Sequence, residues 1–297
     1  MNRTILVTAV ACLFVPANVA SPELVRGIAI DFVTIGNPGN PGDTRPEANP
    51  TGCGAVDYVY QIGKYEVTNA QWYDFVEAAG EPTGNPSNAY DHSAYWTSDN
   101  IPTNCLSWYE AAQFCNYLTS GDKSQGAYQF SGDNSNPGDF EGIDRDSAIF
   151  TYGIVYVIPT EDEWYKAAYY TGTRYWTYAN GTNVRPIQDV DSNYGWASNG
   201  QPWNVGDGTE EQNGTFDMMG NVKEWNQLLY LDLYRGIRGG SYWYLYYTAL
   251  GSSMSVVTYP YNDSADYGFR VASVPEPCSL VFLSLGGLAL IRRRRVG

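Results

Sequence analysis

The chain has 297 residues, a formal net charge of −15 and a single histidine. Its aromatic fraction of 15% nearly equals its charged fraction of 16%, and it contains 31 glycines and 16 prolines. This composition excludes a helix bundle and favours a loop-rich domain held together by aromatic side chains. The acidic surface would repel a phosphate backbone, so we expect no nucleic-acid partner.

The first 20 residues have the features of a secretory signal peptide. A short basic start precedes an apolar run, and small residues follow it. Cleavage is expected after Ala17 or Ala20. Cys12 raises the alternative of a lipoprotein signal, but Ala9 replaces the leucine-like residue that such a signal needs, and the apolar run continues past the cysteine. We therefore favour an exported protein whose mature domain spans residues 21–273.

Three helices are predicted by one repeated pattern at their starts. In each, a hydroxyl residue is followed three positions later by Glu or Gln and then by an apolar stretch, which is the signature of a capping box. The three pairs are Thr68 with Gln71, Ser107 with Glu110, and Thr160 with Glu163. A glycine follows each stretch and predicts its end: Gly80, Gly121 and Gly172. The expected core-facing residues are Tyr73 and Val76 in the first helix, Ala111, Phe114, Cys115 and Leu118 in the second, and Trp164, Ala167 and Ala168 in the third.

Between these helices, β-branched and aromatic stretches predict strands. They lie at 25–35, 55–68, 152–160, 242–261 and 267–274. The segment 175–213 is aromatic, rich in asparagine and irregular. The polar segment 131–147 contains many Asp and Asn residues, but its spacing differs from a twelve-residue calcium loop. We interpret it as a solvated hairpin tip.

The C-terminal segment 274–297 has the organisation of a sorting signal. "VPEP" precedes an apolar run from Cys278 to Ile291, and four arginines follow. The run is shorter than the roughly 18–20 residues needed to span a bilayer. The segment closely resembles a PEP-CTERM signal. That resemblance implies transient membrane anchoring, processing by an exosortase, and delivery to the cell surface or the extracellular space; a plain tail anchor is the alternative.

Six phrases in a fixed order resemble the formylglycine-generating enzyme (sulfatase-modifying factor) family. They are "GKYEVTNAQW", "SWYEAAQFCNYL", "IPTEDEWYKAAYY", "FDMMGNVKEWN", "RGGSY" and "YGFRVAS". The resemblance covers residues 27–273. It implies a compact α+β fold related to C-type lectin domains, loop-rich, with little regular secondary structure and stabilised by calcium.

The resemblance also implies the calcium ligands. In "FDMMGNVKEW" they are Asp217, the carbonyls of Gly220 and Val222, and Glu224, a mixture of oxygens that suits calcium. The alternative is that Glu224 is a buried hydrogen-bond acceptor. Lys223 stands where the family has tryptophan. A second family site would begin at Asn193 and the carbonyl of Tyr194, without an identified acidic ligand.

The family's copper chemistry depends on two cysteines that this chain lacks. Members oxidise a substrate cysteine to formylglycine with O₂ and a copper ion held by two thiolates, which are the soft ligands that Cu(I) prefers. The matching positions are Ala249 and Met254, and no cysteine lies between Cys115 and Cys278. One thioether does not replace two thiolates. Copper binding is therefore not expected, and no catalytic residue is assigned.

The other cysteines and the histidine offer no replacement. Cys53, Cys105 and Cys115 remain in the mature domain, so at least one is unpaired. A Cys53–Cys105 disulfide and a free, buried Cys115 are both compatible with the sequence. In some family members the position of Cys115 is paired with one in the last strand, which is Val271 here. His92, the only histidine, is interpreted as a loop residue.

Two functions follow as alternatives. The first is a non-catalytic, lectin-like module that binds an extracellular polysaccharide or a protein. Its expected contact residues are the aromatic side chains next to "RGGS": Trp243, Tyr244, Tyr246 and Tyr247. Ordinary strand packing is the other interpretation of these four. The second function is a formylglycine-generating oxidase that uses other copper ligands, and a structural matrix role remains a third possibility.

Overall fold

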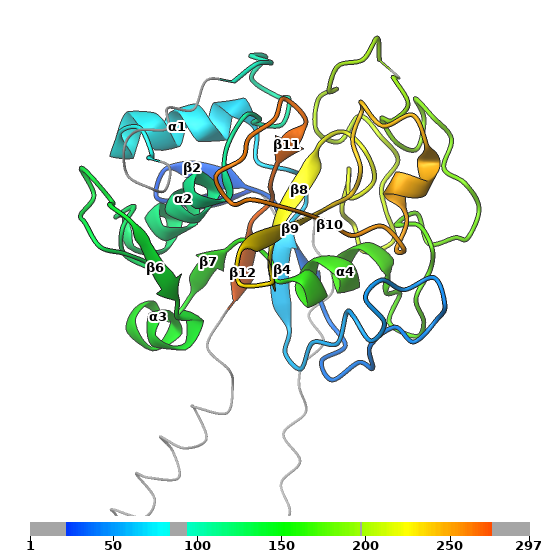
Figure 1. The fold of residues 1–297 in the computed structure, drawn as a ribbon, viewed down its shortest axis with the longest axis horizontal. Coiled ribbons are helices and arrows are strands. Elements are labelled where there is room, and N and C mark those ends of the chain that lie inside the picture. The colour runs from blue at the N-terminus through cyan, green and yellow to red at the C-terminus, as the bar shows by residue number, and fades with distance from the viewer. Residues whose placement is uncertain (1–21, 84–93, 197, 275–297) are drawn as a thin grey trace, which may run out of the picture.

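The computed structural model describes residues 22–83, 94–196 and 198–274. The predicted signal peptide, His92 and the sorting signal after Val274 lie outside the described residues. The described part contains two four-stranded sheets, two separate hairpins and four α-helices, joined by long loops. This architecture confirms the expected loop-rich α+β fold (Figure 1).

The central sheet joins the two ends of the domain. Its order is β3-β4-β12-β7, and all neighbours are antiparallel. The bounds are β3 (Phe32–Ile35), β4 (Tyr60–Gly63), β7 (Val155–Val157) and β12 (Ala272–Val274). Ala272 lies opposite Ile62 on one side and Val157 on the other. The last described strand therefore sits in the middle of this sheet. The single closing strand predicted at 267–274 is divided, because Tyr267–Gly268 form β11 in the second sheet and only Ala272–Val274 form β12.

The second sheet carries the segment around which the candidate site is built. Its order is β10-β9-β8-β11, with β11 parallel to β8 and the other pairs antiparallel. The bounds are β8 (Lys223–Tyr230), β9 (Tyr234–Arg238), β10 (Val256–Thr258) and β11 (Tyr267–Gly268). Glu224 lies opposite Gly268 in this register. The chain therefore passes almost directly from Gly220 and Asn221 into β8 of this sheet.

The remaining strands form two hairpins. They are β1 (Glu23–Val25) with β2 (Ile28–Ile30), and β5 (Tyr128–Phe130) with β6 (Phe140–Ile143). The single strand predicted at 25–35 is wrong, because Arg26 and Gly27 have φ values of 49° and 91° and turn the chain back. The hairpin tip predicted at 131–147 is confirmed only for residues 131–139, because the remainder forms β6 and the start of the next helix.

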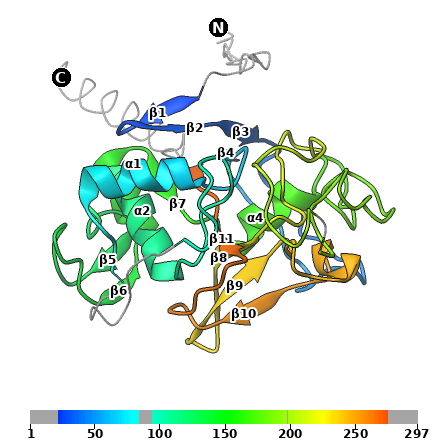
Figure 2. The same cartoon turned by 90° about the horizontal axis from the view of Figure 1, so that it is seen from above.

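The three predicted helices are confirmed, together with their capping boxes. They are α1 (Asn69–Ala79), α2 (Trp108–Ser120) and α4 (Glu161–Tyr169). In α2, for example, the backbone N–H of Glu110 donates to Ser107 Oγ at 3.3 Å, and that of Ser107 donates to Glu110 Oε2 at 2.8 Å. Figure 2 shows α1 and α2 in one half of the molecule and α4 in the other, with β8 and β11 between them.

The helices differ from the prediction in two details. The end of α4 is Tyr170 rather than Gly172, because Tyr170 forms a bridge with Tyr175 and Gly172 serves the turn between them. A further helix, α3 (Arg145–Tyr152), was not predicted. It begins at Asp144, whose side chain accepts from the backbone N–H of Ser147, so it has an N-cap without a full capping box.

The core-facing stripe of α1 was also predicted wrongly at one position. Tyr73 is 47% exposed, whereas its neighbours Trp72 and Phe75 are buried. Trp72 stacks on Phe114 of α2 with ring centroids 5.7 Å apart, which rotates Tyr73 toward solvent. The predicted core residues of α2 and α4 are confirmed as buried. The two halves have separate apolar cores, one around α1 and α2 and one around α4.

The segment 242–261 contains much less strand than predicted. It has a 3₁₀-helix at Tyr247–Leu250 and only β10 as a strand. Gly239 and Gly240, with φ values of 94° and 73°, turn the chain out of β9 before this segment. Backbone bonds then join it to a distant loop, because the N–H groups of Gly195 and Trp196 donate to the carbonyls of Tyr244 and Tyr242.

None of the three cysteines in the described domain forms a disulfide. Cys53 and Cys115 are buried and Cys105 is half-buried, so the possible Cys53–Cys105 disulfide is not formed. Cys115 and Val271 share the first apolar core, as the free, buried alternative implies. Within the described ranges, none of the helices has the length and apolar character that crossing a membrane requires.

Candidate functional site

The loop 214–222 delivers the start of β8 through several left-handed residues. Asp217, Gly220 and Asn221 have φ values of 61°, 85° and 54°. A Cβ atom at Gly220 would overlap the carbonyl oxygen of Asn193 and Ser192 Oγ, so the close approach of the two loops requires glycine there. The N–H of Asn221 donates to that same Asn193 carbonyl at 2.8 Å.

A buried ion pair holds this loop in place. Glu224 Oε1 accepts from Arg270 Nη2 at 2.5 Å, and Glu224 Oε2 accepts from Arg270 Nε at 2.6 Å and Trp164 Nε1 at 2.7 Å. Both charged side chains are fully buried. Arg270 also donates to the carbonyls of Gly63 and Phe216 at 3.0 and 2.9 Å. One guanidinium therefore connects β4, the loop 214–222 and β8.

Three more buried carboxyl groups surround this pair. Burial raises the pKa of Glu211 to about 8 and that of Asp217 to about 6. Burial also raises the pKa of Glu66 well above its usual range, and the carboxylates of Asp217 and Glu224 add to the effect. Arg270 opposes the shifts but offsets one negative charge only. The cluster therefore favours protons or another cation.

The predicted calcium ligands do not fit an ion as they lie. Both oxygens of Glu224 are occupied by Arg270 and Trp164, and those of Asp217 accept from Trp203 Nε1 at 2.8 Å and the N–H of Gly206 at 2.7 Å. Among the residues that the structure describes, no group of three or more acidic, cysteine or histidine side chains forms a metal site. In the second predicted site, Asn193 Oδ1 is buried without a hydrogen-bond partner, and Tyr194 is buried beside it in the chain.

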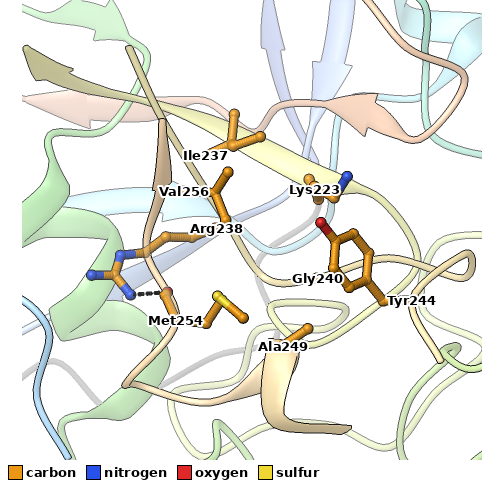
Figure 3. A pocket seen from close by; sticks show the side chains of 8 residues that line it. All are labelled: Lys223, Ile237, Arg238, Gly240, Tyr244, Ala249, Met254 and Val256. Atoms are coloured by element: carbon orange, nitrogen blue, oxygen red, sulfur yellow. Dashed lines mark hydrogen bonds between the residues drawn. The ribbon is translucent and has the colours of Figure 1, made fainter. Parts of the chain in front are cut away.

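The positions of the two missing cysteines face a very small cavity. Ala249 and Met254 line it, and its volume is only about 10 Å³. That is the space of a single water molecule. Figure 3 shows Lys223, Tyr244 and the thioether of Met254 around it. The other lining residues are Ile237, Arg238, Gly240 and Val256. The guanidinium of Arg238 donates to the Met254 carbonyl at 2.7 Å and pairs with Glu161.

Lys223 forms one wall of this closed cavity and ends in an ion pair. Its Nζ lies 2.8 Å from Asp266 Oδ2, and the rings of Tyr244 and Tyr267 flank it with centroids at 4.5 and 4.8 Å. Ser264 Oγ and Ser241 Oγ donate to Asp266 at 2.6 and 2.7 Å. Burial tends to raise the pKa of Asp266, but Lys223 and the two hydroxyls hold it below its usual range.

An open cleft lies on the other side of this ion pair. Its volume is about 320 Å³, within the range of about 300–1,000 Å³ typical of small-molecule sites. It is lined by Tyr95, Trp96, Gly200, Tyr242, Trp243, Ser264, Ala265 and Asp266. Trp96 Nε1 donates to Tyr242 Oη at 3.0 Å, so two segments 146 residues apart form one wall. We call this space the aromatic cleft.

The four predicted contact residues do not line one common space. Trp243 lines the aromatic cleft and is 51% exposed, whereas Tyr244 lines the closed cavity. Tyr246 is 70% exposed, and Tyr247 stacks under the guanidinium of Arg185 at 4.6 Å. Sequence reasoning missed Tyr95, Trp96 and Tyr242. Their only signal was the presence of large aromatics in a loop rich in small and polar residues.

Comparisons with known proteins agree with this fold. The family model of the sulfatase-modifying factor enzyme 1-like domain matches residues 37–274. A curated relative, the chaperone protein LppX of Paenibacillus barcinonensis, is 26% identical over 185 residues, which are 56% of this chain and 61% of the relative. The chain thus matches less than two thirds of that relative's length.

Solved structures of similar fold cover nearly the whole domain. Treponema denticola variable protein 1 superposes with a TM-score of 0.63 at 19% identity, over 86% of this chain and 98% of that one. PvdO from Pseudomonas aeruginosa gives a TM-score of 0.59 at 15% identity, over 82% and 94% of the two chains. These identities establish the fold alone. Because the family model covers most of the sequence, the chain belongs to the family of sulfatase-modifying factor enzyme 1-like domains.

Proposed function

We propose that this protein is an exported, non-catalytic member of its family that binds a ligand at its surface. The closed cavity at Ala249 and Met254 carries the proposal. Neither Ala249 nor Met254 offers a thiolate, and the space beside them, about 10 Å³, holds one water molecule. The ammonium of Lys223 next to it would also repel a metal cation.

The aromatic cleft supports the binding role. Tyrosine and tryptophan side chains provide large rigid surfaces with a polar edge, which suits recognition of an extracellular polysaccharide or a protein. Of the four predicted contact residues, Trp243 lines this cleft and is 51% exposed. Processing by an exosortase and transient anchoring through residues 274–297 complete the proposal, and place the domain at the cell surface or outside the cell.

The alternative function is a copper-dependent oxidase of cysteine. The test incubates the purified protein with Cu(I), O₂ and a cysteine-containing peptide, and follows loss of the thiol by mass spectrometry. We expect no turnover and no stoichiometric Cu(I) binding. The double variant Ala249→Cys with Met254→Cys serves as the matched control, since it restores the family's two thiols. Turnover by the unmodified protein would refute the proposal.

Calcium at Asp217, Gly220, Val222 and Glu224 also stays a prediction. The excess of buried carboxyl groups supports a bound cation, whereas the saturation of Glu224 by Arg270 opposes it. Melting temperatures measured with chelator and with added calcium distinguish the two arrangements. If Arg270 has replaced the ion, chelator leaves the melting temperature unchanged. A drop that Glu224→Gln abolishes would establish the calcium site.

A further inference from the structure

Trp196 is not among the lining residues of the aromatic cleft, but it packs against Trp243, which is, and an unusual backbone holds it there. Trp196 and Trp243 lie with ring centroids 4.1 Å apart, and each is about half exposed. Trp196, Ser198 and Asn199 have φ values of 63°, 48° and 59°. Such left-handed conformations cost about 1 kcal/mol or more for each residue other than glycine. This loop is therefore held in a strained form with its tryptophan at the cleft.

The fold supports this strained loop from two sides. The N–H of Trp196 donates to the carbonyl of Tyr242 at 2.8 Å, next to Trp243 in the chain. The ring of Trp196 also packs so closely over Gly200 that a Cβ there would lie 2.8 Å from its Cε3 atom. Strain of this kind collects at functional sites. Trp196 therefore packs against Trp243 and restrains its indole at the cleft.

The charges in the cleft are already neutralised. Of its eight described lining residues, Asp266 is the one that is ionised, and Lys223 pairs with it at 2.8 Å. An anionic ligand would meet no unpaired cation in the lining and would be repelled by the net charge of −15. A cationic ligand would compete with Lys223 for the same carboxylate. The charge balance therefore favours a neutral ligand.

The cleft nevertheless offers hydrogen bonds. Asp266 Oδ1 accepts a hydrogen bond from Ser264 Oγ, and a carboxylate oxygen can accept a hydrogen bond from a second donor. The hydroxyl group of Tyr95 can both donate and accept, and Ser264 Oγ, whose hydrogen is donated to Asp266, can accept. A ligand that suits these features has an apolar face for the indoles and hydroxyl groups at its edge. Pyranose rings have both.

We propose that the aromatic cleft binds a neutral saccharide, with a sugar ring stacked on Trp243, which Trp196 holds in place, and its hydroxyl groups directed to Asp266 and Ser264. This assignment deepens the proposed binding function and rests on it. The cleft volume of about 320 Å³ suits a mono- or disaccharide unit of a longer chain better than a folded protein surface.

Isothermal titration of the purified protein with neutral cello-, malto-, xylo- and N-acetylchito-oligosaccharides tests the proposal. We expect at least one series to bind. Trp243→Ala and Trp196→Ala should each weaken it by about tenfold or more, while Trp243→Phe, which keeps an aromatic face, should retain most of the affinity. Tyr261→Ala is the matched control, because Tyr261 is 52% exposed and does not line the cleft. Circular dichroism and melting temperature verify that each variant is folded.

Three outcomes would overturn the saccharide assignment. They are no binding of any neutral series up to about 10 mM, binding of oligoalginate or choline in their place, and saccharide binding that survives both alanine substitutions. The copper and peptide assay on the same preparation separates this failure from that of the proposed function. If no saccharide binds and the peptide is not oxidised, only the saccharide assignment is refuted. If the peptide is oxidised, the proposed non-catalytic function is refuted.

Discussion

Two neighbouring spaces lie on opposite sides of the Lys223–Asp266 ion pair, and they differ in almost every respect. The closed cavity at Ala249 and Met254 has room for one water molecule, whereas the aromatic cleft has a volume of about 320 Å³. The aliphatic stem of Lys223 helps to fill the first, and its ammonium neutralises the carboxylate that lines the second. One residue therefore affects both spaces.

Under the proposed function, the positions that match the family's two thiols are packed while the neighbouring cleft stays open. Packing favours filling a buried space that no ligand occupies. Half-exposed indoles add less stability than buried ones, so the exposure of Trp243 and the strained backbone at Trp196 support a binding role.

The largest expected effect comes from breaking the buried ion pair of Glu224 and Arg270. Arg270→Met leaves Glu224 buried and unpaired, so the free energy of unfolding should fall by about 3–5 kcal/mol. Denaturant titration measures it. The exposed Arg174 provides the control, and Arg174→Met should change stability by less than about 0.5 kcal/mol. Equal effects of the two substitutions would contradict the assigned role of Arg270.

The buried carboxyl groups of Glu66, Glu211 and Asp217 near the loop 214–222 predict an unusual dependence of stability on pH. The pKa values of Glu211, about 8, and Asp217, about 6, are raised in the folded state. The folded protein then holds protons that the unfolded chain releases, so stability should decrease by a few kcal/mol as pH rises from about 5 to 8. Glu211→Gln should flatten this slope.

Calcium would change the sign of that result. An ion bound to the cluster would favour the ionised carboxylates, so stability in the presence of calcium would increase with pH over the same range. Chemical denaturation at several pH values, with calcium and with chelator, therefore measures whether protons or a metal ion balance the buried charge. A rising curve in chelator would contradict the raised pKa values.

Removing the ion pair between the two spaces should have an intermediate effect. Lys223→Met leaves Asp266 without its cation, and at pH 7 we expect a loss of about 2–3 kcal/mol, since the pair is slightly exposed. Lys223 lowers the pKa of Asp266, so the stability it contributes is present above about pH 4 and is lost as pH falls further. The difference between the two proteins should therefore shrink in acid. A constant difference would indicate that packing of the lysine stem dominates.

The smallest effects compare the two spaces directly. Ala249→Leu adds volume to the closed cavity and should cost about 1–3 kcal/mol, because the surrounding core has to shift. Trp243→Ala removes a half-exposed side chain from the aromatic cleft and should cost about 0.5–1.5 kcal/mol, which is typical of a ring contact such as that with Trp196. Thermal unfolding of both variants checks the order. A reversed order would mean that the cleft residues serve folding rather than binding.

Local patterns gave the more successful predictions. The starts of α1, α2 and α4 were correct because a capping box is completed within four residues and needs no distant partner. The exposed Tyr73 and the end of α4 were predicted wrongly because both depend on contacts from elsewhere, namely the stacking of Trp72 on Phe114 and the bridge of Tyr170 with Tyr175. The segment 242–261 was predicted as a strand on composition, but bonds to residues 195 and 196 hold much of it as a loop.

The sequence by itself determined the family, the helix starts and the absence of the two thiols, since these depend on residue identity and short spacing. Only the tertiary structure decided that Arg270 forms an ion pair with Glu224, that Lys223 forms one with Asp266, and that Trp96 donates a hydrogen bond to Tyr242. Each of these contacts joins residues far apart in the chain. Their partners are selected by burial and charge in the folded protein, which spacing along a single sequence does not encode.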